Sequence, residues 1–85
     1  MNINELELAE QAIMRIYSNL KLRTGEGLFK PVFMNFWPPD VRRELFQDAM
    51  NSLISKGLVE VGEQKPGFFC VSRSGFMALN ELTNY

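Results

Sequence analysis

Apolar residues near the start of the chain recur every three or four positions, and this spacing predicts a helix over residues 4–22. Asn4 is suited to cap its first turn, and acidic side chains fall early and basic ones late, the order that the helix dipole favours. The apolar face consists of Leu6, Ala9, Ile13, Ile16, Tyr17 and Leu20. Leu8, Met14 and Leu22 fall off this face and are either scattered surface residues or part of a dimer interface.

A glycine-containing segment over residues 23–27 ends this helix, and Gly25 or Gly27 suits the left-handed position that follows a helix. Leu28 and Phe29 then predict a short strand that adds to a hairpin later in the chain.

Two prolines, Pro38 and Pro39, separate the next two predicted helices, residues 31–36 and residues 39–56. Trp37 and Pro38 each precede a proline, which disfavours the helical conformation, so the chain breaks rigidly at this point. The longer helix has an apolar face made of Val41, Leu45, Ala49 and Leu53, with Phe46 and Met50 beside it.

The remainder of the chain predicts a β-hairpin over residues 58–72 and then a helix over residues 72–82. Gly57 ends the preceding helix, because glycine readily takes the left-handed conformation. Ser72 is suited to cap the last helix. Several helices and one hairpin in 85 residues predict a single α+β domain that is mostly α-helical.

The charge of the chain is nearly balanced, with nine basic and ten acidic residues and a net charge of -1. Strong non-specific binding to nucleic acid usually needs a basic surplus, because neutralising phosphates releases counterions. The composition therefore weighs mildly against a DNA role. Hydrophobic residues make up 46% of the chain and include seven Phe, enough for one small core with some apolar side chains left at the surface or at an interface.

The chain contains few residues that are suited to catalysis or to metal binding. The chain contains no His, so the usual general base near neutral pH and the Ser–His and Cys–His pairs are absent. A single cysteine supplies neither a metal site nor an internal disulfide. Cys70 lies in a predicted strand and is either a small buried apolar residue or a reactive thiol. We expect no enzymatic activity and no cofactor.

The first residues are polar and acidic and show no secretory signal segment. No apolar run approaches the roughly 20 residues that a membrane-spanning helix needs. The chain also lacks the cysteine framework of small secreted domains. These features predict a cytoplasmic protein that does not contact a membrane.

In its second half the chain resembles the winged helix-turn-helix superfamily, in the compact form found in bacterial repressors. The resemblance is best over residues 40–82, while residues 1–38 fit by element order. It rests on Leu53-x-x-x-Gly57-Leu58-Val59, on the hairpin that follows, and on Val71-Ser72-x-x-Gly75 leading into Leu79. The segment Trp37-Pro38-Pro39-Asp40 departs from the family, because it is bulkier and stiffer than the small-residue turn usual between the two helices.

The resemblance implies that the predicted helix over residues 39–56 enters the major groove of double-stranded DNA, and that the hairpin, as the wing, contacts the flanking backbone. Arg43 would then contact guanine, and Gln47 or Asn51 would contact adenine. The further DNA contacts that it implies are Arg42 at the helix start, Gln64 and Lys65 in the wing, and Arg73 close to the wing.

The exposed face of this helix also carries Glu44 and Asp48, which phosphate repels, so the same polar residues are alternatively ordinary solvated surface. Lys65 is alternatively an ordinary exposed turn lysine. Trp37 is either an anchor in the core or a partner-facing residue at an interface.

The resemblance and the composition together predict two alternative functions. The first is a small transcriptional regulator that binds a short DNA site as a dimer, formed through the first or the last helix. The second is a winged helix used as a protein-binding module, an adaptor or an inhibitor, with Leu8, Met14, Leu22 and Trp37 at the interface. The near-neutral charge and the seven Phe favour the second function.

Overall fold

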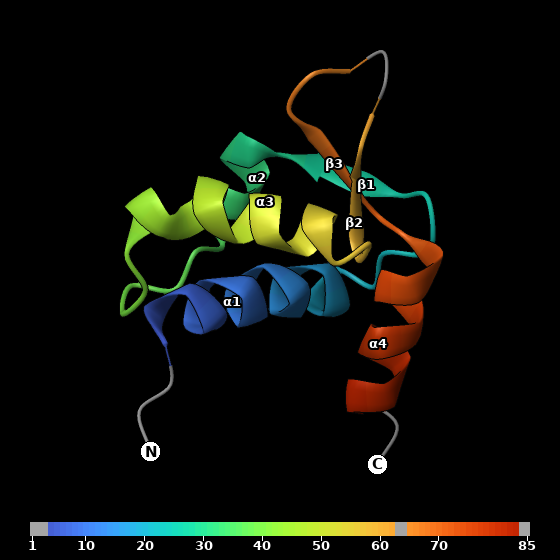
Figure 1. Cartoon of the computed structure of the whole chain (residues 1–85), viewed down its shortest axis with the longest axis horizontal. Helices are drawn as coiled ribbons and strands as arrows, with labels where there is room; N and C mark the ends of the chain where they lie inside the picture. The colour runs from blue at the N-terminus through green and yellow to red at the C-terminus, as the bar shows by residue number, and fades with distance from the viewer. Residues whose placement is uncertain (1–3, 63–64, 84–85) are drawn as a thin grey trace.

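The computed structural model describes residues 4–62 and 65–83, and in this part of the chain it shows four α-helices and a small three-stranded antiparallel sheet (Figure 1). The elements are α1 (Glu5–Asn19), β1 (Gly27–Phe29), α2 (Lys30–Asn35), a 3-10 helix η1 (Arg43–Leu45), α3 (Phe46–Ser55), β2 (Val59–Val61), β3 (Phe68–Val71) and α4 (Arg73–Thr83). The predicted α+β class, mostly helical, is confirmed. Within the described residues no helix is both long and apolar enough to cross a membrane.

The sheet has the strand order β1-β3-β2, so the predicted first strand does join the hairpin (Figure 1). Leu28 of β1 lies opposite Phe69 of β3, and Val59 of β2 lies opposite Val71 of β3. Side chains alternate between the two faces of a strand, and these positions form the face that is packed against the helices. The sheet therefore closes one side of the core.

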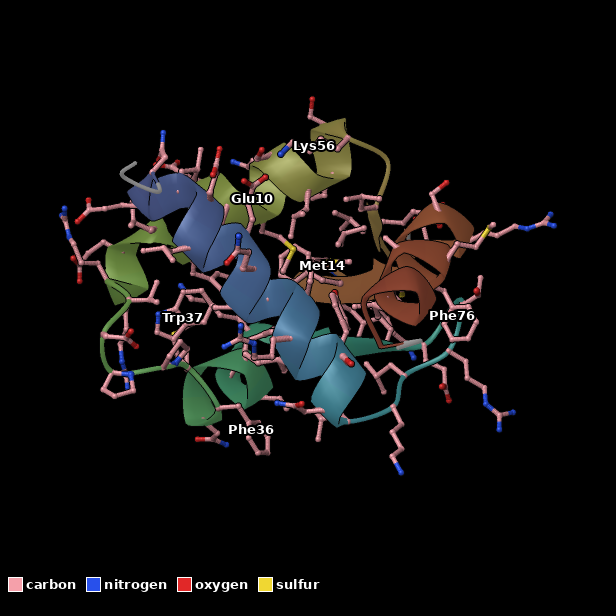
Figure 2. All side chains as sticks on the ribbon, turned by 90° about the horizontal axis from the view of Figure 1, so that it is seen from below. Glu10, Met14, Phe36, Trp37, Lys56 and Phe76 are labelled. Atoms are coloured by element: carbon pink, nitrogen blue, oxygen red, sulfur yellow. The ribbon has the colours of Figure 1, made fainter. Side chains whose placement is uncertain are left out.

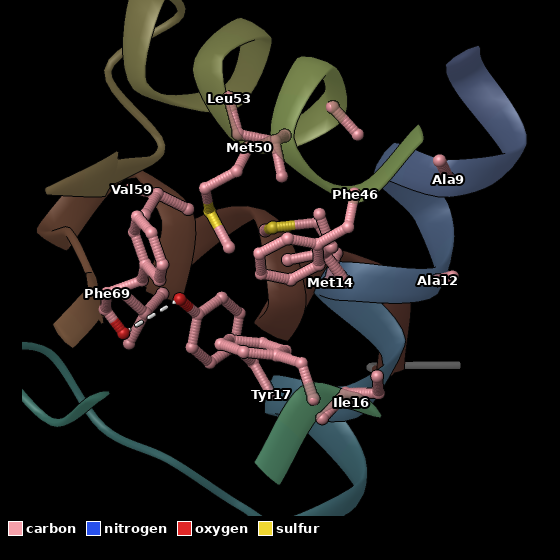
Figure 3. Packing of buried hydrophobic residues seen from close by; sticks show 14 of the residues in the cluster. Ala9, Ala12, Met14, Ile16, Tyr17, Phe46, Met50, Leu53, Val59 and Phe69 are labelled. Carbon is pink, nitrogen blue, oxygen red and sulfur yellow. Dashed lines mark hydrogen bonds between the residues drawn. The ribbon is translucent and has the colours of Figure 1, made fainter. Parts of the chain in front are cut away.

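The core contains a cluster of aromatic rings that pack edge-on or tilted against one another between the helices and the sheet (Figure 3). The ring of Phe33 contacts those of Tyr17 and Phe46 at centroid distances of 5.3 and 5.4 Å. The buried Tyr17 hydroxyl donates a hydrogen bond to the backbone carbonyl of Phe69 at 2.9 Å (Figure 3). Burial raises the pKa of the Tyr17 phenol well above its usual range. This bond ties the centre of α1 to the middle strand of the sheet.

The two long helices end in similar hydrogen-bonded turns. After α3, Gly57 takes the predicted left-handed conformation with φ +76°, and the Leu58 amide donates to the Leu53 carbonyl at 3.0 Å. After α1 the left-handed residue is Lys21, with φ +56°, and the Leu22 amide donates to the Tyr17 carbonyl. The prediction that Gly25 or Gly27 takes the left-handed position after α1 is therefore wrong, because Lys21 takes it and the same kind of backbone hydrogen bond closes the helix.

The predicted helix over residues 39–56 begins later than expected. Residues 39–42 form a turn, η1 follows, and regular α-helix starts only at Phe46. Arg42 has an extended conformation, with φ -66° and ψ 127°, so the chain is still outside the helix there. The Trp37 indole nitrogen donates to the Val41 carbonyl at 3.0 Å and closes the turn. Two successive prolines and this closed turn delay the helix by about two turns.

The start of α4 is held against the turn between α3 and β2. The Ser72 hydroxyl accepts from the Gly75 amide at 3.0 Å, as the predicted cap, and donates to the Gly57 carbonyl at 2.6 Å. Gly75 approaches the backbone so closely that a Cβ there would lie 2.1 Å from the Leu58 carbonyl oxygen. The Ser-x-x-Gly spacing therefore serves two purposes, a cap and a close contact between segments.

Candidate nucleic-acid interface

An exposed row of polar side chains follows α3 and the turn before it. Arg43, Gln47 and Asn51 are four residues apart and are all exposed. In an α-helix this spacing brings side chains close together on one face, which applies to Gln47 and Asn51, whereas Arg43 lies in η1 just before α3. Here the Gln47 amide nitrogen donates to the Asn51 side-chain carbonyl at 3.0 Å. The row thus carries a guanidinium and two adjacent amides.

The orientation of α3 decides which way this row faces. The Ser52 hydroxyl donates to Glu10 of α1 at 2.7 Å, so Ser52 lies on the flank of α3 nearest α1. Each residue advances about 100° around a helix. On that geometry Asp48 lies near the Ser52 flank, while Gln47 and Asn51 lie about 100° to 140° away from it. Asp48 is therefore only about 60° from Asn51 and about 100° from Gln47, so the carboxylate and the amides share the exposed face of α3.

The β2–β3 hairpin extends from the molecule on the side away from α1 (Figure 1). Lys65 lies in this hairpin, is exposed, and holds its ammonium 5.1 Å from the centre of the Phe68 ring. Gln64 lies outside the described residues. Lys65 and the two amides of α3 therefore lie on the same side of the molecule, away from α1.

Two other basic residues near α3 are already paired with carboxylates. Arg42 lies 3.4 Å from Glu5 and 3.3 Å from Glu44, with all three side chains exposed. Lys56 lies 2.8 Å from Glu10. These pairs reduce the positive potential that α3 presents to a phosphate backbone.

Arg73 is exposed at the first position of α4, at the end of β3 remote from Lys65. The four residues of β3 span about 13 Å, so the structure does not bring Arg73 and Lys65 together. Of the predicted DNA contacts, Gln47, Asn51 and Lys65 lie on the side away from α1, and Arg43 lies in η1 directly before α3.

Glu10 is a buried charged residue of α1, and its partners come from α3 and from the residue that follows it (Figure 2). It accepts hydrogen bonds from the Ser52 hydroxyl and from the Lys56 ammonium. Burial alone raises the pKa of the Glu10 carboxyl, but the bonds from Lys56 and Ser52 outweigh it, and the pKa lies below its usual value. The sequence pattern missed this network, because residues 42 and 46 positions apart supply the partners.

Beside this network a groove of about 770 Å³ runs between α1, the end of α3 and α4. Met14, Leu53 and Leu79 supply its apolar lining, and Glu10 and Lys56 lie along its edge. Among the residues that the structure describes, no group of three or more His, Cys, Asp or Glu side chains is placed to hold a metal ion.

Two predicted interface residues turn out to be core residues. Met14 is only 8% exposed, because α1 packs against both α3 and α4 and its buried arc is wider than the apolar pattern suggests. Trp37 is 6% exposed and bonded to Val41, so its alternative assignment as a core anchor holds. Leu22 is half-buried against the core. Leu8, at 36% exposure, stays available to a partner.

Cys70 is half-buried on β3, on the face of the sheet turned away from the core. Burial raises the pKa of its thiol, and the nearby Glu60 carboxylate raises it further. The thiol is therefore protonated at neutral pH, which favours an unreactive cysteine over a nucleophile.

No protein-family model matches the chain, and comparisons with curated proteins and with solved structures give no match. Function is therefore inferred from the geometry described above.

Proposed function

We propose that the domain is a winged helix that binds duplex DNA through α3 and the β2–β3 hairpin, as a small regulator without catalytic activity. The observation that carries the proposal is the exposed row Arg43, Gln47 and Asn51, in which the two amides of α3 are hydrogen-bonded to each other on the side of the molecule that also carries Lys65. The order of helices and strands, with a first strand added beside a hairpin, supports the winged helix assignment.

The two amides of α3 match the edge of an adenine. Their mutual bond uses the Gln47 nitrogen and the Asn51 carbonyl, and it leaves the Gln47 carbonyl and the Asn51 nitrogen for a partner. Adenine presents an amino donor and the N7 acceptor in the major groove, which this pair complements. Arg43 lies one turn earlier and suits guanine or a phosphate. Lys65 in the hairpin suits a backbone phosphate.

The carboxylates near α3 set the strength of the interaction. Asp48 and Glu44 lie beside the polar row, and Arg42 is already paired with Glu5 and Glu44. Few free cations then face the phosphates, so non-specific affinity is weak and specificity depends on the amides.

Fluorescence anisotropy with labelled duplex DNA from a sequence selection tests the proposal through three variants. Asn51→Ala is expected to weaken binding by about 1 to 3 kcal/mol and to relax the preference for adenine. Asp48→Asn is expected to tighten binding roughly two- to fivefold, because it removes a charge that repels phosphate. Glu7→Gln removes an exposed carboxylate of α1 and serves as the matched control, with affinity unchanged.

If Asp48→Asn and Glu7→Gln change the affinity equally, α3 does not face the DNA, and the proposed interface is wrong. The same conclusion follows if Asn51→Ala binds the selected sequence as tightly as the parent.

A second candidate function is a winged helix module that binds another protein. The observation that favours it is the set of exposed aromatic side chains, Phe36 at 55% and Phe29 at 45% exposure. Under this alternative the parent protein and Asp48→Asn both fail to bind DNA at low salt.

A further inference from the structure

A second, smaller groove lies on the opposite side of α1 from the Glu10 network. Figure 2 shows Phe36 and Trp37 on one side of α1 and Glu10 and Lys56 on the other. The groove encloses about 160 Å³ between α1 and the segment that follows α2. Its apolar lining consists of Leu8, Ala12, Ile16, Phe36, Pro38 and Val41.

The apolar side chains at this groove are unusually accessible. Phe36 is 55% exposed and Leu8 is 36% exposed, although both border the groove. Complete burial of an exposed phenylalanine side chain contributes about 1.5 to 3 kcal/mol of favourable free energy. A partner that covers this surface would therefore gain binding free energy.

The wall of the groove is held in place before any partner arrives. Trp37 is buried behind it, donates to the Val41 carbonyl and packs edge-on against Phe46 with ring centres 5.7 Å apart. Pro38 adds a fixed backbone angle. A preformed wall lowers the conformational cost of binding.

The charges beside the groove are of opposite sign and come from different segments. Arg15 of α1 and Asp40 of the turn both line the groove, and both are exposed. In a contact between two copies related by a two-fold axis through the groove, Arg15 of each copy would pair with Asp40 of the other. The surface therefore carries a protruding ring, an apolar groove and a complementary charge pair, the three parts that a self-complementary contact needs.

We propose that a second copy of this chain docks on this groove as a two-fold dimer, with Phe36 of each copy entering the groove of the other. Ten residues line the groove, which is fewer than the 20 to 30 per side of a standard interface, so the dimer is weak and reversible. The groove lies on the other side of α1 from the Glu10 network, and no residue of α3 lines it. The inference does not depend on DNA binding.

Analytical ultracentrifugation of the full chain without DNA, from about 1 to 500 µM, tests the dimer. The parent is expected to pass from monomer to dimer across this range, a span suited to a small interface. Phe36→Ser is expected to weaken dimerisation roughly tenfold or more, since a central aromatic side chain is lost. Phe29→Ser removes a comparably exposed phenylalanine from the sheet and serves as the matched control, with dimerisation unchanged.

A charge exchange tests the symmetry of the contact. Arg15→Asp and Asp40→Arg each place like charges opposite one another and are expected to weaken the dimer severalfold. The double variant restores the opposite pairing and is expected to recover most of the parent's association. Circular dichroism of each variant checks that the fold is retained.

A parent protein that stays monomeric up to 500 µM overturns the proposal, even where a different protein is later found on the groove. Dimerisation that Phe36→Ser and Phe29→Ser weaken equally also overturns it, because the contact then lies elsewhere. Since DNA is absent from the experiment, either result leaves the proposed DNA interface to be judged by its own test.

Discussion

Replacing Gly75 by alanine is expected to destabilise the domain, although the same change usually stabilises a helix. Alanine favours an α-helix over glycine by up to about 1 kcal/mol. At Gly75, however, the new Cβ would lie 2.1 Å from the Leu58 carbonyl oxygen and 2.9 Å from a methyl carbon of Val71. The start of α4 must therefore move by about 1 Å to restore an ordinary contact distance.

The expected loss of unfolding free energy follows from the packing and the hydrogen bonds that this movement disturbs. Overpacking of this kind costs about 1 to 3 kcal/mol, and stretching the bonds of Ser72 to Gly75 and Gly57 costs about 1 kcal/mol more. After the gain in helix propensity, Gly75→Ala is expected to lose about 1 to 3 kcal/mol. For a domain of 85 residues this lowers the melting temperature by about 5 to 20 °C.

Urea unfolding followed by circular dichroism measures this difference. Ser74→Ala is the matched control, because Ser74 is exposed in the same turn of α4 and its replacement changes stability by less than about 0.5 kcal/mol. A Gly75→Ala variant as stable as the parent, or more stable, would refute the close approach of α4 to the Leu58 carbonyl.

Two further predictions concern buried polar groups. Tyr17→Phe removes the bond to the Phe69 carbonyl and is expected to cost about 1 to 2 kcal/mol in urea unfolding at pH 7. Because burial raises the pKa of Tyr17, the parent also loses stability as the pH rises above about 10, and this alkaline loss should shrink in the variant. Glu10→Gln is expected to cost about 1 to 2 kcal/mol at pH 7, since the bond from Lys56 loses its charge. The pKa of Glu10 is lowered in the folded protein, so its contribution to stability is present above about pH 4.5 and is lost as the pH falls further. A difference in unfolding free energy between parent and variant that stays constant from pH 7 to pH 3 would contradict this.

The sequence predicts the ends of several helices correctly. Asn4 and Ser72 accept hydrogen bonds at the starts of α1 and α4, and Gly57 ends α3. These positions can be predicted because capping depends on residues that are close together in the sequence. The start of α3 was misplaced, since the turn before it is closed by the Trp37 indole, a contact that no propensity reports.

The parts of the site that could not be predicted all depend on distant partners. The pairing of Arg42 with Glu5 joins residues 37 positions apart. Because of it, the basic residue at the start of the predicted DNA-recognition helix is already paired with a carboxylate. Met14 was assigned to the surface because one helix pattern cannot show that a second helix, α4, also packs on α1. Phe36 is the last residue of the predicted helix over residues 31–36, but α2 ends at Asn35 and the Phe36 side chain is 55% exposed.

The salt dependence of binding to random duplex DNA tests the central proposal most directly. On random DNA, Arg43 and Lys65 are the two cations that the proposed face offers to phosphates, and each such contact contributes about -0.9 to the slope of log affinity against log salt concentration. We therefore predict measurable binding at about 50 mM salt and a slope of about -2 for each bound chain. No binding at that salt concentration, or binding that does not change with salt, would contradict the assignment of α3 and the hairpin to DNA.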